Sequence, residues 1–281
     1  MTRTLAGLSA SLPRNRWTLE RFGFSPGKLR YRIVDAGAPR VFCVSIPKAG
    51  THLLERAICL HPRMYRKLLP TISAVDLRRR DGFEGLVARM RPGQVVVAHL
   101  RFDPAYREVL ARRGVRGLFL IRDPRDIVVS QVHYMSKRTD HQFHELFARQ
   151  PDHRERLRLA ITGDVAHEVP SIGERLEAYA GWLDSGCLVV RFEDLVGSDG
   201  GGNPAAQYRA VASVFQHLGL EAEESLVRSV CDRLFSPNSP TFRQGSIGGW
   251  RGSFDEELEA LFDEVVGDRA ESYGYGPLGG T

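Results

Sequence analysis

Short runs of consecutive apolar residues alternate with longer, more polar stretches along this chain. Residues 41–46 (VFCVSI), 94–99 (QVVVAH), 117–121 (GLFLI) and 187–192 (CLVVRF) are four such runs. Successive apolar residues rich in Val, Ile and Phe are typical of strands that are buried on both faces. We therefore expect four buried strands separated by helical segments.

Helix start signals stand between these runs. Asp103 and Asp123 each precede a proline, which places a capping residue before a proline at the first helical position. Ser171 and Glu174 form a capping-box pattern. Strands that alternate with helices predict an α/β fold, with a central parallel β-sheet flanked by helices on both faces.

Three stretches interrupt this alternation. Residues 63–81 contain a basic cluster, residues 133–170 are polar, and residues 197–204 have the composition of a turn. We interpret residues 1–281 as a single domain with an N-terminal extension over 1–40. Residues 63–81 and 133–170 are then insertions near the carboxyl ends of strands, where open α/β sheets place ligands.

Composition narrows the class of protein. The 281 residues include 39 Lys and Arg against 34 Asp and Glu, a formal charge of +5. This mild excess fits an acidic small molecule or a nucleotide and is too small to indicate a nucleic-acid partner. An apolar content of 42% with 26% charged residues excludes a disordered chain.

The cysteines and the N-terminal sequence indicate in which cellular compartment the protein is expected to lie. Cysteines stand at 43, 59, 187 and 231, without the spacing of a zinc site. Cys43 and Cys187 fall in apolar runs, and we interpret them as small buried side chains, which suits a reducing compartment. No signal peptide and no run of about 18 apolar residues is visible, so we expect a soluble, cytoplasmic protein without a membrane span.

The first candidate site, SIPKAGTHLL from position 45, follows the first run directly. A turn between a strand and a helix directs backbone N–H groups and a helix N-terminus at one point, which favours an anion. Gly50 permits a close backbone approach, Thr51 adds a hydroxyl and Lys48 a cation. Because the lysine precedes a single glycine by two residues, this is not the GxxxxGK[ST] pattern. An ordinary strand–helix turn remains the alternative at this stage.

Two further segments contain arginines in positions that suit an anion. Arg122 ends the third run at a predicted helix start, and Ser130 follows eight residues later. Eight residues are about two helical turns, so both residues contact one ligand only if it lies along the helix flank. Residues 241–251 (TFRQGSIGGWR) place three glycines beside Arg243.

Together the three segments resemble the sulfotransferases that use 3′-phosphoadenosine 5′-phosphosulfate (PAPS). PKAGTHLL is similar to the phosphosulfate loop PKSGTxxL, IRDPRDIVVS to the 3′-phosphate motif, and FRQGSIGGWRGSF to the pattern RKGxxGxWK. The order and spacing agree over residues 41–254. The resemblance implies a P-loop-like nucleotide-binding topology and a bacterial-type member related to the cytosolic enzymes.

The resemblance also implies a set of site residues. Lys48 is expected to contact the bridging oxygen between sulfate and phosphate and to neutralise charge on the leaving group, and Ser130 is expected to bind the 3′-phosphate with Arg122. Lys48 and Ser130 are the catalytic residues that the resemblance implies besides a histidine. The implied contacts to the nucleotide are Lys48, Ala49, Gly50, Thr51, His52 and Leu53 in the first segment, and Arg122, Ser130, Arg243, Gln244 and Gly245 in the others. No metal is required by the family mechanism, and the sequence has no constellation of metal ligands. The histidines at 133, 141, 144, 153 and 167 lack the spacing of a metal motif, and we interpret their insertion as a solvated acceptor lid.

His99, at the end of the second run, resembles the strand-end histidine of the family. Imidazole titrates near neutral pH, so it can accept the proton of a hydroxyl group. A lone histidine at a strand end is otherwise usually structural; the three phosphate motifs favour the catalytic reading. Phe102 then begins a helix that would wall the acceptor pocket.

The chain departs from the family pattern at several positions. Ala49 replaces a serine, Gln244 a lysine, Phe192 a tyrosine and Gly249 an aspartate, and Leu53 stands where eukaryotic members have an adenine-stacking tryptophan. Phe235 is a candidate for stacking on adenine, with a core role as the alternative.

We therefore predict in-line transfer of a sulfuryl group from PAPS to the hydroxyl of a small molecule, such as a phenol, sugar, lipid or secondary metabolite. One alternative is a P-loop-like kinase, which would need Mg²⁺ and a GK[ST] sequence. A second alternative is a non-catalytic nucleotide-binding relative. The retention of both Lys48 and His99 argues against it. A homodimer stays open, because residues 255–281 show an amphipathic helix without a clear dimerisation motif.

Overall fold

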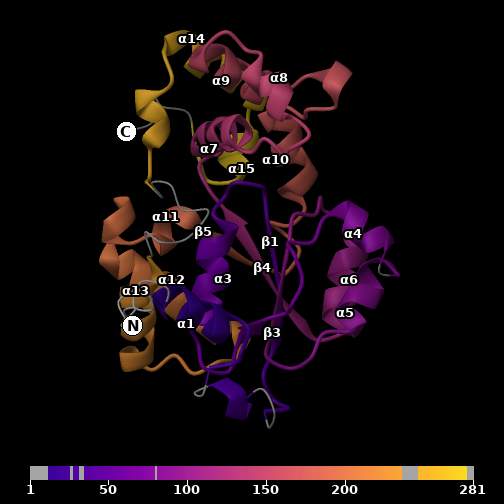
Figure 1. The fold of residues 1–281 in the computed structure, drawn as a ribbon, viewed down its shortest axis with the longest axis vertical. Coiled ribbons are helices and arrows are strands. Elements are labelled where there is room, and N and C mark those ends of the chain that lie inside the picture. The colour runs from indigo at the N-terminus through magenta and orange to yellow at the C-terminus, as the bar shows by residue number, and fades with distance from the viewer. Residues whose placement is uncertain (1–11, 26–27, 32–34, 80, 236–245, 277–281) are drawn as a thin grey trace, which may run out of the picture.

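Five parallel strands form the centre of the protein, whose fold is taken from a computed structural model (Figure 1). The structure describes residues 12–25, 28–31, 35–79, 81–235 and 246–276. The strands are β1 (Arg40–Ser45), β2 (Tyr65–Arg66), β3 (Gln94–Ala98), β4 (Val115–Ile121) and β5 (Leu188–Arg191). Their order is β2-β3-β1-β4-β5, and every pairing is parallel. The predicted fold class, a parallel sheet flanked by helices, is confirmed.

Helices connect the strands and extend beyond them. The α-helices of the described residues are α1 (Leu12–Arg21), α3 (Thr51–Cys59), α4 (Ala74–Arg78), α5 (Gly82–Ala88), α6 (Pro104–Arg112), α7 (Pro124–Lys137), α8 (His144–Ala148), α9 (His153–Thr162), α10 (Ile172–Ala180), α11 (Phe192–Leu195), α12 (Pro204–Leu218), α13 (Glu224–Leu234), α14 (Glu256–Val266) and α15 (Arg269–Ser272). Three 3₁₀ turns are η2 (Val165–His167), η3 (Ser198–Gly200) and η4 (Gly249–Gly252). Within the described ranges, no helix combines the length and the apolar character that a bilayer span requires.

Side chains of the strands alternate between two hydrophobic cores, because successive residues of a strand point to opposite faces. On β1, Val41 and Cys43 pack with α3, α12 and α13, whereas Phe42 and Val44 pack with α5 and α6. Figure 1 shows these two sets of helices on either side of the sheet, with α7–α10, α14 and α15 gathered beyond one end of it. Trp182 is fully buried in the second core, and its indole donates a hydrogen bond to the Leu100 carbonyl at 2.9 Å.

Local sequence signals set the helix starts as predicted. The Asp103 side chain accepts a hydrogen bond from the Ala105 N–H at the start of α6, and Asp123 does the same for Arg125 at the start of α7. Ser171 forms the predicted capping box at the start of α10. Each cap satisfies backbone donors that have no partner within the helix.

The predicted strands are all present, with end points shifted by one or two residues. One strand was missed: β2, which lies within the predicted insertion 63–81 and pairs with β3 at Tyr65 and Arg66. Two residues are too few for an alternation of apolar and polar positions to indicate a strand.

The carboxyl ends of four neighbouring strands meet at one edge of the sheet. Along the order of the sheet, β3 leads into His99, β1 into the turn that carries Lys48, β4 into Arg122 and β5 into Phe192. The connection that leaves β1 runs to β2 on one side of it, and the connection that leaves β3 crosses to β4 on the other side. The strand order therefore reverses at β1, and such a point opens a crevice for ligands.

Candidate active site

The turn after β1 has a strained backbone that only particular residues accept. Lys48 has φ of 77° and Gly50 has φ of 102°, both in the left-handed region. A Cβ atom on Gly50 would overlap the ring of Phe192, which begins α11. Gly50 is therefore required twice, for its backbone conformation and for the close approach of β5's extension.

The N-terminus of α3 faces this turn. Gly50 is the N-cap and provides no side-chain hydrogen bond. The Leu53 N–H donates to the Gly50 carbonyl at 2.8 Å, which leaves the N–H groups of Thr51 and His52 for an anion. The Thr51 hydroxyl lies 2.6 Å from the Ser45 hydroxyl. Ala49 is fully buried, and its N–H donates to the Ile46 carbonyl at 3.1 Å, so its contribution is to shape the turn.

The next two predicted residues, His52 and Leu53, lie in the first turn of α3 and differ in their surroundings. The His52 side chain is 45% exposed and lies 3.5 Å from the Glu55 carboxylate, one turn along α3. Leu53 is partly buried and packs against the core that α12 and α13 share. Leu53, a predicted contact to the nucleotide, thus has an apolar packing role in the described structure.

His99 is oriented by the strand beside it. Its Nδ1 lies 2.9 Å from the Ser45 carbonyl oxygen, which only accepts hydrogen bonds. In the neutral ring the proton therefore resides on Nδ1, and the lone pair of Nε2 has no hydrogen-bond donor among the described residues. Burial lowers the pKa of His99 to about 4, against the opposing effect of the Ser45 hydrogen bond. The imidazole is consequently neutral at pH 7 and able to accept a proton at Nε2.

Lys48 is the cation of the turn. Burial lowers the pKa of its ammonium to about 8, and the charges of Arg122, Arg138 and Arg175 contribute. The Nζ atom lies 3.9 Å from the centre of the Tyr134 ring on α7. Among the residues that the structure describes, no carboxylate lies within ion-pair distance of Lys48. This ammonium is thus held among positive charges without a fixed counter-charge.

Arg122 lies between the turn and the C-terminal segment. Its guanidinium stacks on the Phe192 ring, with Cζ 4.2 Å from the ring centre. One Nη donates to the Ser246 carbonyl at 3.0 Å and lies 3.6 Å from the Asp126 carboxylate. Its Nε atom is buried and has no hydrogen-bond partner among the described residues. A buried donor without a partner is costly unless a ligand satisfies it.

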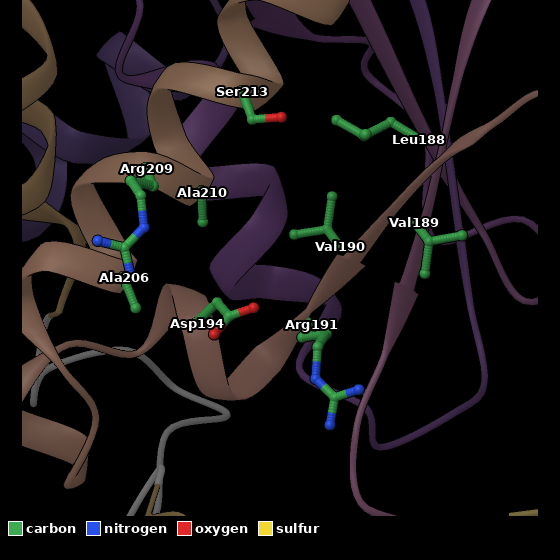
Figure 2. Close-up of a pocket in the computed structure, with 9 residues that line it drawn as sticks. All are labelled: Leu188, Val189, Val190, Arg191, Asp194, Ala206, Arg209, Ala210 and Ser213. Atoms are coloured by element: carbon green, nitrogen blue, oxygen red, sulfur yellow. The ribbon is translucent and has the colours of Figure 1, made fainter. Parts of the chain in front are cut away.

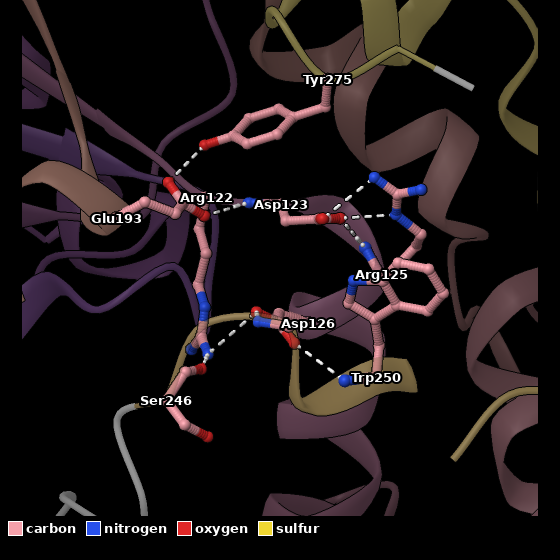
Figure 3. A network of polar contacts seen from close by, with 9 residues as sticks. Arg122, Asp123, Arg125, Asp126, Glu193, Ser246, Trp250 and Tyr275 are labelled. Atoms are coloured by element: carbon pink, nitrogen blue, oxygen red, sulfur yellow. Dashed lines mark hydrogen bonds and ion pairs between the residues drawn. The ribbon is translucent and has the colours of Figure 1, made fainter. Parts of the chain in front are cut away.

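Asp126 ties the C-terminal glycine segment to α7 (Figure 3). Its carboxylate accepts hydrogen bonds from the N–H of Gly248 at 2.9 Å and of Trp250 at 3.1 Å. Ser130 lies one turn further on the same face of α7, four residues from Asp126. Asp126 and Ser130 therefore share one flank of α7, and Arg122, which precedes the helix, approaches that flank at Asp126. That Arg122 and Ser130 share a ligand stays a prediction.

The remaining predicted residues of the third segment, Arg243, Gln244 and Gly245, lie outside the described residues, which resume at Ser246. Phe235 is described as the C-cap of α13.

The sequence analysis did not identify the residues whose hydrogen bonds hold Phe192 and Arg122 in place. Glu193 accepts hydrogen bonds from the Asp123 N–H at 2.9 Å and from the Tyr275 hydroxyl at 2.7 Å, as Figure 3 shows. These bonds join the ends of β4 and β5 and so hold Phe192 between Gly50 and Arg122. The acidic pair after Phe192 was the available signal, although its partners are distant in sequence.

A separate groove runs along the outer edge of the sheet, between β5 and α12 (Figure 2). It has a volume of about 320 Å³ and is lined by residues that include Val190, Arg191, Arg209 and Ser213. None of the candidate site residues lines this groove. The groove and the site are connected only by β5, which leads from the groove into Phe192. The groove is therefore distinct from the candidate site.

The described residues fit a ligand with two anionic groups. One position is the turn, with the start of α3, Thr51 and Lys48; the other is the flank of α7, with Arg122 and Ser130. The unpartnered Nε of Arg122 and the uncompensated ammonium of Lys48 are the observations that favour anions at both positions.

Known proteins resemble the chain in sequence and in fold. No family model matches it. A 3-alpha-hydroxysteroid sulfotransferase of the guinea pig, Cavia porcellus, is 22% identical over 259 residues, covering 82% of this chain and 83% of the relative. A mouse sulfotransferase complexed with PAP superposes with a TM-score of 0.59 at 19% identity, covering 87% of this chain and 88% of the other. Retinol dehydratase in complex with androsterone and the inactive cofactor PAP gives a TM-score of 0.57 at 16% identity, covering 88% and 85%. The predicted resemblance is thereby confirmed: this chain is similar to the sulfotransferases in sequence and shares their fold.

Proposed function

We propose that this chain is a sulfotransferase that transfers a sulfuryl group from PAPS to a hydroxyl group of a small acceptor. The named relative is a sulfotransferase, and the structural neighbours are bound to PAP, which remains when PAPS has given up its sulfuryl group. The two anion-binding positions support a nucleotide that carries phosphate groups at both ends of its ribose.

The observation that carries the proposal is the position of Ser45. Its carbonyl oxygen orients His99, and its hydroxyl contacts Thr51 at the start of α3. The candidate base and the candidate phosphate loop are therefore held by the same residue, at the ends of adjacent strands. A base beside an anion-binding turn suits the transfer of an anionic group to a hydroxyl.

Each side chain has a task in this proposal. His99 accepts the acceptor's proton at Nε2, while its Nδ1–H keeps donating a hydrogen bond to the Ser45 carbonyl. Lys48 and the N–H groups of α3 stabilise negative charge on the oxygen that leaves. Arg122 and Ser130 orient the nucleotide from the flank of α7. PAPS, when bound, supplies the activated sulfuryl group.

The predicted insertions border the acceptor side in this proposal. Ile72, in the insertion 63–81, accepts a hydrogen bond from the His99 N–H at 2.8 Å. Tyr134, in the insertion 133–170, lies against the Lys48 ammonium. Both insertions thus reach the two residues at which chemistry is proposed.

The proposal is tested with His99→Ala. We expect sulfate transfer from PAPS, followed by mass spectrometry over a panel of hydroxyl acceptors, to fall at least about a hundredfold. PAP affinity, measured by calorimetry, should stay close to that of the wild type. His217→Ala is the matched control, because His217 contacts a backbone carbonyl, that of Gly117, at 3.0 Å and lies on α12 away from the site.

Near-normal turnover by His99→Ala would exclude His99 as the base. Failure of the wild type to bind PAP and to transfer sulfate would overturn the function itself. A Mg²⁺-dependent transfer of phosphate from a nucleotide would favour the kinase alternative instead.

Lys48→Ala tests the leaving-group role. Because stabilisation of developing charge acts in the transition state, kcat should fall more than KM rises. If only KM changed, Lys48 would serve in binding alone.

A further inference from the structure

Arg175 is a buried cation that the sequence motifs did not single out. It lies in the first turn of α10 and is 7% exposed. One Nη donates to the Pro47 carbonyl at 2.8 Å, and the other donates to the Gln131 side-chain oxygen. Both acceptors are neutral, and no carboxylate of the described residues lies within ion-pair distance of Arg175.

Such a charge is unusual in a protein interior, since burying a charge without a counter-charge is unfavourable. Burial lowers the pKa of Arg175 to about 10, which still leaves the guanidinium charged at pH 7. Arg66 provides the contrast within the same fold: it is 4% exposed and forms an ion pair with the buried Glu55. The fold therefore compensates the buried Arg66 and leaves Arg175 without a counter-charge among the described residues.

The two contacts of Arg175 connect the parts of the candidate site. Pro47 immediately precedes Lys48, so the bond to its carbonyl fixes the peptide unit that leads into the strained Lys48 backbone. Gln131 immediately follows Ser130 on α7 and is itself buried. Arg175 thus connects the turn after β1 to α7 through Pro47 and Gln131, while its own side chain stays buried.

We propose that Arg175 is a positioning residue, which holds the Pro47 carbonyl against α7 and strengthens anion binding at the turn through a charge that only the bound ligand compensates. The proposal rests on the proposed function, because it assigns a further determinant of nucleotide affinity at the same site. It adds a residue from α10 to the segments that the motifs indicated.

Gln131→Glu is the decisive variant. The new carboxylate has the shape of the amide and accepts the same hydrogen bond, but it compensates the charge of Arg175. We expect the unfolding midpoint to equal or exceed that of the wild type, whereas the Kd for PAP rises about tenfold. If Arg175 acted only by holding the turn against α7, the stronger contact with the new carboxylate in Gln131→Glu would leave the affinity for PAP unchanged or increase it.

Two further variants separate charge from shape. Arg175→Lys keeps the charge but reaches fewer acceptors, so its Kd for PAP should lie between those of the wild type and Gln131→Glu. Gln216→Glu adds the same charge at an exposed position of α12 and should leave the Kd unchanged. A Kd for Gln131→Glu within twofold of the Gln216→Glu value would overturn the proposal, as would weaker binding by Arg175→Lys than by Gln131→Glu.

A second readout does not depend on the nucleotide. Lys48 titrates among the charges of Arg122, Arg138 and Arg175, so compensation of Arg175 should raise the pKa of Lys48. The pH dependence of Lys48 labelling by an amine reagent, followed by mass spectrometry, measures this shift in wild type and Gln131→Glu. An unchanged labelling profile would overturn the electrostatic role, whereas a wild type that does not bind PAP would overturn the proposed function and leave this readout intact.

Discussion

Lys48 and His99 bind their protons less tightly in this fold than in water. Burial is the largest cause in both, and neighbouring positive charges add to it. The consequences differ, because a pKa of about 4 makes His99 neutral at pH 7, whereas a pKa of about 8 keeps most of Lys48 charged. One residue is thereby prepared to accept a proton, and the other retains the charge that an anion requires.

A pH dependence of nucleotide binding follows at the same scale. A bound anion favours the charged form of Lys48, so binding raises its pKa and takes up protons near pH 8. We expect PAP affinity to fall about tenfold between pH 7 and pH 9, as the free ammonium loses its proton. Calorimetry in buffers of different ionisation enthalpy measures both the affinity and the proton uptake.

The control for this prediction is another lysine of the chain. Lys137 is exposed at the end of α7, so Lys137→Ala should retain the pH slope, whereas Lys48→Ala should lose it. A slope that persists in Lys48→Ala would assign the titration to a different group.

At the scale of elements, α7 organises the part of the candidate site where we propose that the nucleotide binds. Its first turn is fixed by the Asp123 cap, its flank carries Asp126 and Ser130, and its buried face holds Gln131. Asp126 binds the backbone of Gly248 and Trp250, and so holds the segment from Ser246 onward against α7. The position of this segment therefore depends on α7.

Asp126→Asn tests this dependence. The amide nitrogen would face a backbone N–H, leaving one of the donors of Gly248 and Trp250 without an acceptor. We expect the free energy of unfolding to fall by about 1–3 kcal/mol and trypsin to cleave faster after the exposed Arg251. Urea unfolding and limited proteolysis measure the two effects.

Asp263→Asn, at an exposed position of α14, is the control and should change neither quantity. Unaltered cleavage after Arg251 in Asp126→Asn would show that the segment is held by other contacts.

At the scale of the molecule, one buried carboxylate links the N-terminal helix to the sheet. Glu55 on α3 is 1% exposed and forms ion pairs with Arg21 of α1 and Arg66 of β2. Although burial alone would raise the pKa of Glu55, the hydrogen bond of His52 and the charges of Arg66 and Arg21 lower it to about 2.

This pKa predicts an acid-dependent part of the stability. Because the folded value lies below the usual 4.5, the contribution is present above about pH 4.5 and is lost as the pH falls towards 2. Its size is about 3 kcal/mol. Urea unfolding of the wild type and of Glu55→Gln over this pH range should show a difference in unfolding free energy that is large at pH 7 and shrinks below pH 4.

Glu108→Gln serves as the comparison, since Glu108 is exposed on α6. Its stability curve should run parallel to that of the wild type. A difference between wild type and Glu55→Gln that stays constant down to pH 3 would contradict the assignment.

The elements and the first layer of the site follow from local sequence signals. The apolar runs, the caps at Asp103 and Asp123 and the capping box at Ser171 depend on neighbours within a few residues, so their pattern predicts structure directly. Lys48, His99 and Arg122 could also be predicted from the sequence. Each follows the end of a strand, and the carboxyl ends of parallel strands lie at one edge of the sheet.

The sequence by itself determined a parallel sheet and the resemblance of its turns to nucleotide-binding motifs. Only the tertiary structure decided what holds those turns: Phe192 against Gly50, Asp126 against Gly248, and Arg175 against Pro47. The last two contacts join residues that are 122 and 128 positions apart, and no local pattern encodes such pairs. The protonation of His99 and Lys48 was decided at the same level, because burial and neighbouring charge exist only once the chain has folded.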